Sequence, residues 1–273
     1  EKPAMGRQAV RQAMAICDTP REIIPEEIRR EHSILSADRA YYAIHEPASM
    51  EEAEMAKKRL IFEEFFIFSA GLSLMRAARA TKTAPIYANQ NLEEFYGALP
   101  FRLTGAQSRA ISEISADFRK GAPMNRLVQG DVGSGKTMVA AAAAYLCVKN
   151  GHQAAMMAPT EILAEQHYAS LSRIFEPLGL RTALLTGSMS IKEKRIVREA
   201  IAAGEIDLAV GTHALLSEAT RFCNLGLVIT DEQHRFGVGQ RSALSAKGRD
   251  PHLLVMSATP IPRTLALLMY GDL

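Results

Sequence analysis

The longest hydrophobic pattern in the first part of the chain is that of a helix. From Met50 to Arg79, large apolar side chains recur at steps of four, three, four and three residues, which is the period of a helix with one buried face. Glutamates at its start complement a helix N-terminus. The pattern predicts one long amphipathic helix whose buried face is made of Ile61, Phe65, Phe68, Leu72 and Met75.

Residues 1–49 show no pattern of comparable length. Arginines and glutamates alternate there with Pro20, Pro25 and Pro47, and prolines interrupt or start helices. We expect short helices and turns that pack on the long helix, and no catalytic residue among them.

The pattern changes near residue 98, where short apolar runs begin to alternate with helical stretches. Such alternation indicates parallel strands joined by right-handed crossovers, and hence a three-layer α/β domain with ligands beyond the carboxyl ends of its strands. We therefore predict an α-helical segment over residues 1–98 and an α/β domain over residues 99–273. The predicted strands are Arg126–Gln129, Gln153–Ala158, Thr182–Leu185, Asp207–Val210, Leu227–Thr230 and His252–Met256.

Composition narrows the class of protein. The 273 residues are 48% hydrophobic and 23% charged, which predicts a folded protein with a buried core. The net charge of +2 divides into −2 over residues 1–98 and +4 over the rest, so the α/β part is only mildly basic. Three widely spaced cysteines match neither a disulfide framework nor a zinc site, and no apolar run is long enough for a bilayer. We expect a cytoplasmic protein without a membrane partner.

A phosphate-binding loop lies between the first predicted strand and the Ala-rich helix that follows it. The sequence fits G-x-x-x-x-G-K-[ST], in which glycines let backbone N–H groups and the helix N-terminus point at a polyphosphate. Lys136 adds a positive charge for the outer phosphates, and the Thr137 hydroxyl can bind Mg²⁺. The predicted nucleotide-binding residues of this loop are Gly130, Gly133, Ser134, Gly135, Lys136 and Thr137.

Two carboxylates follow the apolar run that ends at Thr230. Asp231 can hold Mg²⁺ and Glu232 can orient or deprotonate the attacking water, because hydrolysis of a phosphoanhydride needs positioning and charge neutralisation. Without other motifs, such a pair is more often the charged start of a helix than a catalytic pair. A P-loop in the same domain favours the catalytic interpretation. His234 has no other His or Cys at ligand spacing, so we reject a zinc site.

Hydroxyl groups follow the last predicted strand, at Ser257 and Thr259. A Pro comes next, so this segment alone is a common helix start. With the P-loop and the Asp-Glu pair, however, three strand ends carry side chains suited to phosphate chemistry. This agreement supports a nucleotide site at one edge of the sheet.

These three segments, in this order, resemble motifs I, II and III of superfamily 2 helicases and translocases. The resemblance implies a RecA-like P-loop NTPase domain that binds ATP and Mg²⁺ and moves along nucleic acid. It also implies that Lys136 and Asp231–His234 are catalytic, and that Gln233, His234, Ser257 and Thr259 relay the nucleotide state to the nucleic acid. The family's nucleic-acid contacts fall on Thr160, Thr186 and Thr212, for each of which capping of the next helix is an equal alternative.

A segment before the P-loop, Leu103 to Gln107, resembles the family's Q-motif region. The resemblance implies that Gln107 reads the edge of adenine and that Phe101 packs near the base. The assignment of a role to Phe101 is weaker than that of Gln107.

Within that superfamily, Asp231 to Arg241 and Met256 to Leu265 resemble bacterial DNA branch-migration helicases. These are monomeric, nucleoid-associated proteins that remodel replication forks and Holliday junctions in recombination and repair. The segment Arg59 to Phe66 resembles the helical linker that joins their wedge domain to their first motor domain. Their N-terminal wedge and C-terminal motor domains are not in this sequence, so we expect a fragment that hydrolyses ATP poorly, because the second motor supplies arginines worth about 10³–10⁵ in rate.

Three alternatives remain open. Transcription-repair coupling translocases are close relatives that have a second Glu where this chain has Gln233. A small-molecule kinase would need an acceptor pocket and a lid, and the motif II and III residues argue against it. A nucleotide-binding module without activity in isolation is the non-enzyme reading, and intact Lys136 and Glu232 argue against it for the parent protein.

Overall fold

The computed structural model describes residues 3–18, 20–80, 83–231, 244 and 246–258. They divide into two compact units, Glu1–Arg76 and Ala77–Leu273. None of the described helices combines the length and the apolar character needed to cross a membrane.

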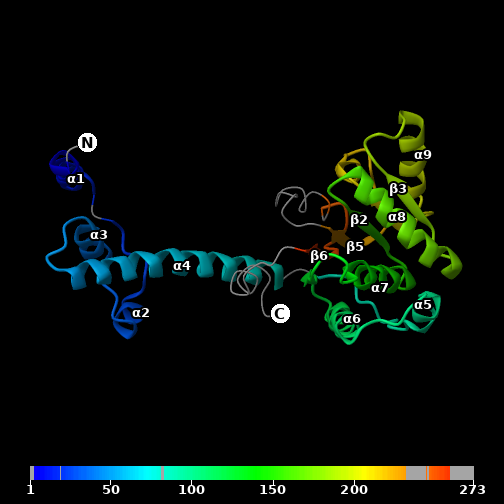
Figure 1. The fold of residues 1–273 in the computed structure, drawn as a ribbon, viewed down its shortest axis with the longest axis horizontal. Helices are drawn as coiled ribbons and strands as arrows, with labels where there is room; N and C mark the ends of the chain where they lie inside the picture. Colours follow the sequence, from blue (N-terminus) through cyan, green and yellow to red (C-terminus); the bar gives the residue numbers. More distant parts are fainter. Residues whose placement is uncertain (1–2, 19, 81–82, 232–243, 245, 259–273) are drawn as a thin grey trace. The chain divides into compact units, whose positions relative to one another are not determined.

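The first unit is helical, as predicted (Figure 1). Its helices are α1 (Pro3–Ile16), α2 (Glu26–Glu31), α3 (Ala37–His45) and α4 (Met50–Ala80). Ala40 and Ala43 of α3 pack against Ala56 of α4, and all three are fully or almost fully buried. Small side chains let two helix backbones approach closely, so α3 lies directly on α4.

The buried face of α4 is not the predicted one. Ile61, Phe65 and Phe68 are 48%, 59% and 42% exposed, whereas Ala56 and Arg59 are completely buried. The guanidinium of Arg59 pairs with Glu22 at 2.9 Å and with Glu63, which explains how a charge is accommodated there. The side chains of Leu72 and Met75 lie outside the described part. The periodicity identified the helix correctly, but the alanines and Arg59 select the face that packs.

The second unit contains a six-stranded sheet in which every paired neighbour is parallel. The strand order is β1-β6-β5-β2-β4-β3. All six predicted strands are present, with ends that differ by two residues at most. The strands are β1 (Asn125–Gln129), β2 (Gln153–Met157), β3 (Thr182–Leu185), β4 (Leu208–Gly211), β5 (Leu225–Thr230) and β6 (His252–Ser257).

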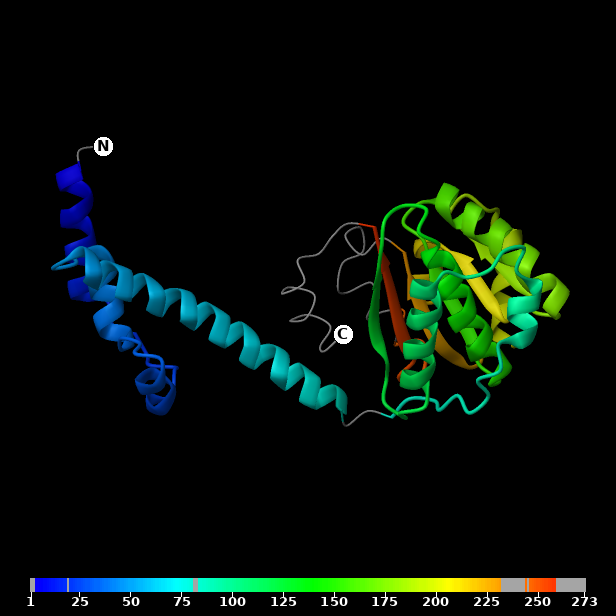
Figure 2. The same ribbon diagram turned by 60° about the horizontal axis from the view of Figure 1, so that its bottom comes forward.

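Helices cover both faces of the sheet (Figures 1 and 2). Alternate residues of the strands pack on α6, α7 and α8 on one face and on α9 and the loop after β4 on the other. The described helical elements of this unit are α5 (Glu93–Ala98), α6 (Gly105–Phe118), α7 (Lys136–Lys149), α8 (Glu161–Phe175), η1 (Glu176–Leu178), α9 (Ile191–Ala202) and η2 (His213–Leu216).

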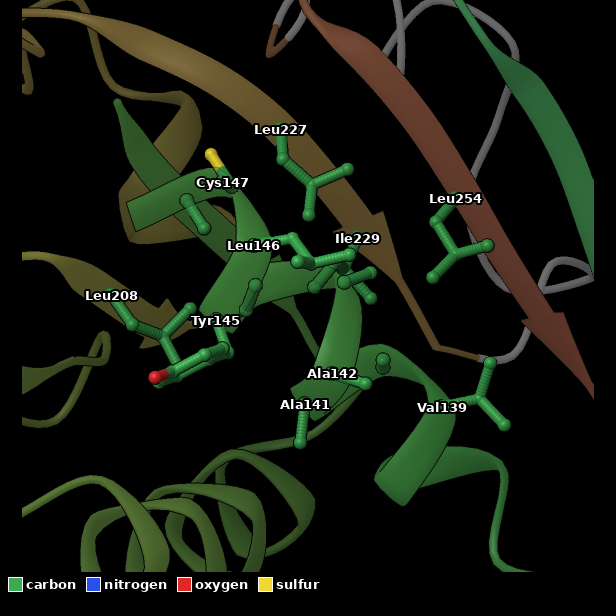
Figure 3. Close-up of a cluster of buried hydrophobic side chains, with 14 of the residues drawn as sticks. Val139, Ala141, Ala142, Tyr145, Leu146, Cys147, Leu208, Leu227, Ile229 and Leu254 are labelled. Atoms are coloured by element: carbon green, nitrogen blue, oxygen red, sulfur yellow. The ribbon is translucent and has the colours of Figure 1, made fainter. Parts of the chain in front are cut away.

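Helix α7 is the centre of the larger core. Nine consecutive residues from Val139 to Cys147 are buried, because the helix is covered on every side. Figure 3 shows Leu146 facing Leu227 and Ile229 of β5, with Leu254 of β6 beside them. The helix that starts at the P-loop is therefore fixed in the interior.

The boundary between the units differs from the predicted one near residue 98. Tyr87, Leu92 and Phe95 are buried in the core of the sheet domain, and the Tyr87 hydroxyl donates to Cys147 Sγ of α7 at 3.2 Å. Residues 83–98 therefore belong to the second unit. The sequence did not show this, because these side chains are spaced without a regular period.

Candidate nucleotide site and adjoining pocket

The P-loop joins β1 to α7. It starts where the Gly130 N–H donates to the Ser257 carbonyl of β6 at 3.2 Å, and it ends at Gly135, whose φ of +79° lets α7 begin at the next residue. The Lys136 ammonium donates to the carbonyl oxygens of Gly130 at 2.6 Å and Asp131 at 2.9 Å. The loop is thus folded around the side chain of its own lysine.

Four strand ends meet at one cavity of about 510 Å³. The P-loop follows β1, Pro159 and Leu163 follow β2, Asp231 follows β5 and Ala258 follows β6. Of the predicted nucleotide residues, Gly133, Gly135, Lys136 and Thr137 line this cavity together with Asp231. Pro159 and Leu163 were not among the predicted site residues. The lining consists of Val132, Gly133, Gly135, Lys136, Thr137, Pro159, Leu163, Asp231 and Ala258.

The cavity fits a magnesium nucleotide. A Cβ added at Gly130 would lie 2.8 Å from Ser134 Oγ, and one at Gly135 would lie 2.2 Å from Gln107 Nε2, so the loop leaves room for backbone only. Thr137 and Asp231 offer a hydroxyl and a carboxylate, the oxygen donors that Mg²⁺ prefers. The described residues contain no cluster of three or more His, Cys, Asp or Glu side chains that could hold a metal.

Gln107 lies against the P-loop. Its Nε2 donates to the Ser134 carbonyl at 3.0 Å and its Oε1 accepts from the Thr104 N–H at 2.8 Å, within the capping box that starts α6. These bonds use one of the two N–H groups of Nε2 and one of the two lone pairs of Oε1. Phe101 is 50% exposed and does not line the cavity. Both base contacts stay predictions.

The predicted relay residues are only partly described. Ser257 is buried at the end of β6, where its carbonyl holds the start of the P-loop. Glu232, Gln233, His234 and Thr259 lie outside the described residues.

Asp231 has a partner that the motifs did not indicate. Its Oδ2 lies 2.7 Å from Nε2 of His167 on α8, and its N–H donates to the Met157 carbonyl of β2 at 2.9 Å. The first contact comes from α8 and the second from β2, the strand that precedes α8 and lies next to β5 in the sheet. The sequence signal was weak, because a lone histidine within a helix is ordinary.

A second cavity, of about 460 Å³, adjoins the first and shares Pro159 with it. It lies at the ends of β2, β3 and β4. Two cations from α9, Lys194 and Arg198, line it and were missed in the sequence, although their spacing of four residues places them on one helix face. The full lining is Pro159, Thr160, Glu161, Gly187, Lys194, Arg198, Thr212, His213 and Ala214.

Two of the three predicted nucleic-acid threonines line this second cavity. Thr160 caps α8, where its hydroxyl accepts from the Leu163 N–H at 3.3 Å, and Thr212 is buried after β4. Thr186 is also buried, and its hydroxyl lies 3.2 Å from that of Ser188 within its own turn. Its neighbour Gly187 lines the cavity instead.

The charges of the second cavity are mixed. The hydroxyl and N–H of Ser188, the Gly187 N–H and the nearby Lys194 hold the pKa of Glu161 below its usual value. The Lys194 ammonium donates to the Gly187 carbonyl and the Arg198 Nε donates to Thr220 Oγ1 at 3.2 Å. The Glu161 carboxylate accepts the Ser188 N–H from the turn after β3 at 2.9 Å, and its lowered pKa favours the charged form, so a negative charge lies beside the two cations.

Comparison with known proteins identifies the class. The model of the DEAD/DEAH box helicase family matches residues 104–268, which include the P-loop, Asp231 and Ser257. The chain belongs to this family. Its parallel sheet with helices on both faces is the RecA-like domain predicted from the motifs.

Within that class, the chain is similar to the ATP-dependent DNA helicase RecG. It is 46% identical to RecG of Bacillus subtilis, over 98% of this chain and 40% of that protein. RecG of Thermotoga maritima is 46% identical over 95% of this chain and 34% of the relative. The chain thus spans less than half the length of these relatives.

Solved structures of helicases are also similar to this chain. A structure of RecG bound to a three-way DNA junction matches with a TM-score of 0.83 and 41% identity, over 100% of this chain and 37% of that one. The helicase MrfA bound to DNA is 22% identical with a TM-score of 0.53, over 70% of this chain and 30% of that one, which supports the fold alone.

Proposed function

We propose that this chain is the linker and first motor domain of an ATP-dependent DNA helicase that remodels branched DNA in bacterial recombination and repair. The observation that carries the proposal is the pair of adjoining cavities at one sheet edge, one lined by the P-loop and Asp231, the other by Thr160, Thr212 and two cations. The similarity to RecG over nearly the whole chain supports it.

The nucleotide site acts by positioning and charge. Lys136 exchanges its two loop carbonyls for phosphate oxygens, and the backbone N–H groups of the loop bind the remaining ones. Thr137 and Asp231 hold Mg²⁺, which neutralises charge on the phosphates. Glu232 orients the water that bonds to the γ-phosphorus as the bond to the β–γ bridging oxygen breaks, giving ADP and phosphate.

The second cavity accommodates the DNA backbone. Lys194 and Arg198 can bind phosphates, and Thr160 and Thr212 offer their hydroxyls, a mode of contact that positions the strand without reading sequence. Gln233, His234, Ser257 and Thr259 relay the nucleotide state to this track. Pro159, which lines both cavities, places the two ligands next to each other.

Two further domains of the whole protein are implied by the resemblance of the motifs to those of branch-migration helicases. A wedge domain separates strands ahead of the linker, and a second motor domain closes over the nucleotide and contributes arginines. The whole protein acts as a monomer in the cytoplasm, on the nucleoid. Without its second motor the 273-residue chain binds nucleotide weakly and turns it over slowly.

ATP turnover on forked DNA tests this function. The 273-residue chain and a version extended to the length of RecG are assayed at fixed salt, with and without a fork. We expect DNA-stimulated turnover in the extended protein only, and its loss in Glu232→Gln. Turnover in the 273-residue chain equal to that of the extended protein would contradict the proposal that hydrolysis depends on the second motor domain.

A further inference from the structure

The contact between His167 and Asp231 connects a residue outside every predicted motif to the proposed metal carboxylate. The two atoms are 2.7 Å apart, and the side chains are only 12% and 15% exposed. An ionised carboxylate accepts only, so Nε2 of the imidazole donates to Oδ2. At this distance the bond fixes one of the two carboxylate oxygens of Asp231.

Helix α8 holds the imidazole firmly. Thr160 caps its first turn, and Ala164 and Leu171 on the inward side are buried. Residues three and four apart share a helix face, so Leu163, which lines the nucleotide cavity, and His167 point the same way. The histidine therefore reaches Asp231 from a fixed backbone position.

The position of Asp231 is fixed from the same side. Its N–H donates to the Met157 carbonyl of β2, and β2 leads directly into α8. Backbone and side chain of the aspartate are thus both bound to the β2–α8 unit. This leaves Oδ1 as the oxygen without a bond to His167.

We propose that His167 is a positioning residue of the nucleotide site: it orients the Asp231 carboxylate so that its other oxygen is presented to the magnesium nucleotide. The inference rests on the proposed function, which assigns the metal to Asp231 and Thr137. Partners that orient a metal ligand in this way typically change metal affinity or activity by about 10–100-fold when removed. A histidine that merely packed α8 on the sheet would have no such effect.

The test is a magnesium titration of nucleotide binding by the full chain. Binding of a fluorescent ATP analogue is measured from EDTA to saturating Mg²⁺ for the unsubstituted protein and for His167→Leu, which removes the donor. His167→Gln is the rescue variant, because its Nε2 can occupy the place of the ring Nε2. Gln166→Leu, on the exposed side of α8, is the matched control.

We expect His167→Leu to raise the Mg²⁺ concentration for half-maximal binding at least about tenfold, while binding in EDTA stays the same. Gln at this position restores most of the affinity, and the control has no effect. An unchanged or lowered midpoint in His167→Leu, or an equal loss of binding in EDTA, would overturn the positioning role. If the unsubstituted protein itself binds nucleotide without any dependence on Mg²⁺, the proposed metal site fails, and the role of His167 fails with it.

Discussion

Gln107 Nε2 donates to the carbonyl oxygen of Ser134 at 3.0 Å, which joins the first turn of α6 to the P-loop. The same Nε2 would lie 2.2 Å from a Cβ at Gly135. The amide therefore occupies the space that a side chain at the end of the loop would need. Loop conformation and Gln107 are coupled, whether or not the glutamine also contacts a base.

Gly135→Ala is expected to weaken nucleotide binding at least about tenfold, or about 1.4 kcal/mol. Its φ of +79° costs an L-residue about 1–2 kcal/mol, and the methyl group displaces Gln107 from Ser134. Gly151→Ala is the matched control, because φ is +78° there and the added Cβ meets nothing within 4 Å. Fluorescent-nucleotide titration and thermal unfolding separate the two effects. Equal nucleotide affinity in both variants would show that Gln107 does not couple to the loop.

Lys194→Ala is expected to weaken DNA binding and to reduce the slope of log affinity against log salt by about one, as the loss of one phosphate contact predicts. Lys192, exposed on the same helix and not part of the second cavity, is the control. The measurement is fluorescence anisotropy of a labelled fork at several salt concentrations, on the extended protein. If Lys192→Ala and Lys194→Ala lower the slope equally, the second cavity is not the DNA track.

Glu22→Gln is expected to destabilise the helical unit by roughly 1–3 kcal/mol near pH 7, because buried Arg59 loses a charged partner. Partial burial raises the pKa of Glu22, but the N–H groups of Ile24 and Ala37, with Arg59 and Arg29, outweigh this and lower it below 4.5. The stabilisation is thus complete above pH 4.5 and is lost as the pH falls through the lowered value.

Urea unfolding of the helical signal at pH 7 and at acid pH measures this effect. Glu26→Gln, which removes the exposed pair with Arg30, should cost less than about 1 kcal/mol. A loss as large as that of Glu22→Gln would show that burial of Arg59 does not matter.

His252→Asn is expected to flatten the acid side of the stability profile of the sheet domain. The buried ring accepts the Met124 N–H through Nδ1 at 3.0 Å and donates to the Pro85 carbonyl through Nε2 at 2.8 Å, and burial lowers its pKa below 6.5. The unfolded chain therefore binds a proton before the folded one does. The contribution of His252 to the free energy of unfolding is complete above pH 6.5. It declines as the pH falls, by up to about 1.4 kcal/mol per pH unit for one such group.

Chemical unfolding at pH 7 and pH 5 checks this expectation. The variant should be less stable at pH 7, because the Pro85 bond is lost, yet should lose less on acidification. His152, whose pKa burial also lowers, contributes a remaining slope. An acid dependence as steep as that of the unsubstituted chain would contradict the assignment to His252.

Much of the sheet domain could be predicted from sequence because its signals are local. Strands of four to six apolar residues and a P-loop between a strand and a helix indicate both the elements and the edge where they meet. The contact between Asp231 and His167 was not predictable in this way. It depends on the strand order, which makes β5 and β2 neighbours in the sheet although they are far apart in the sequence. Two of the three threonines that the sequence suggested as nucleic-acid contacts, Thr160 and Thr212, line the second cavity, but its cations come from a helix without a motif.

In the helical unit, the position of the long helix was predictable from sequence but its buried face was not. Periodicity located α4 within one residue of its observed end, yet it selected the wrong face, because it counts large apolar residues and gives no weight to alanine. Ala40, Ala43 and Ala56 pack closely because they are small. Arg59 is buried there beside two carboxylates, and one of them, Glu22, comes from a distant segment that the periodicity of α4 does not reveal.

The central claim is that the nucleotide cavity belongs to a DNA-driven motor, and the most direct test is ATP turnover by the extended protein with and without forked DNA. We predict strong stimulation by the fork that disappears in Lys136→Ala and in Glu232→Gln. Turnover that ignores DNA, together with transfer of the γ-phosphoryl group to a small acceptor, would contradict the account and identify a kinase instead.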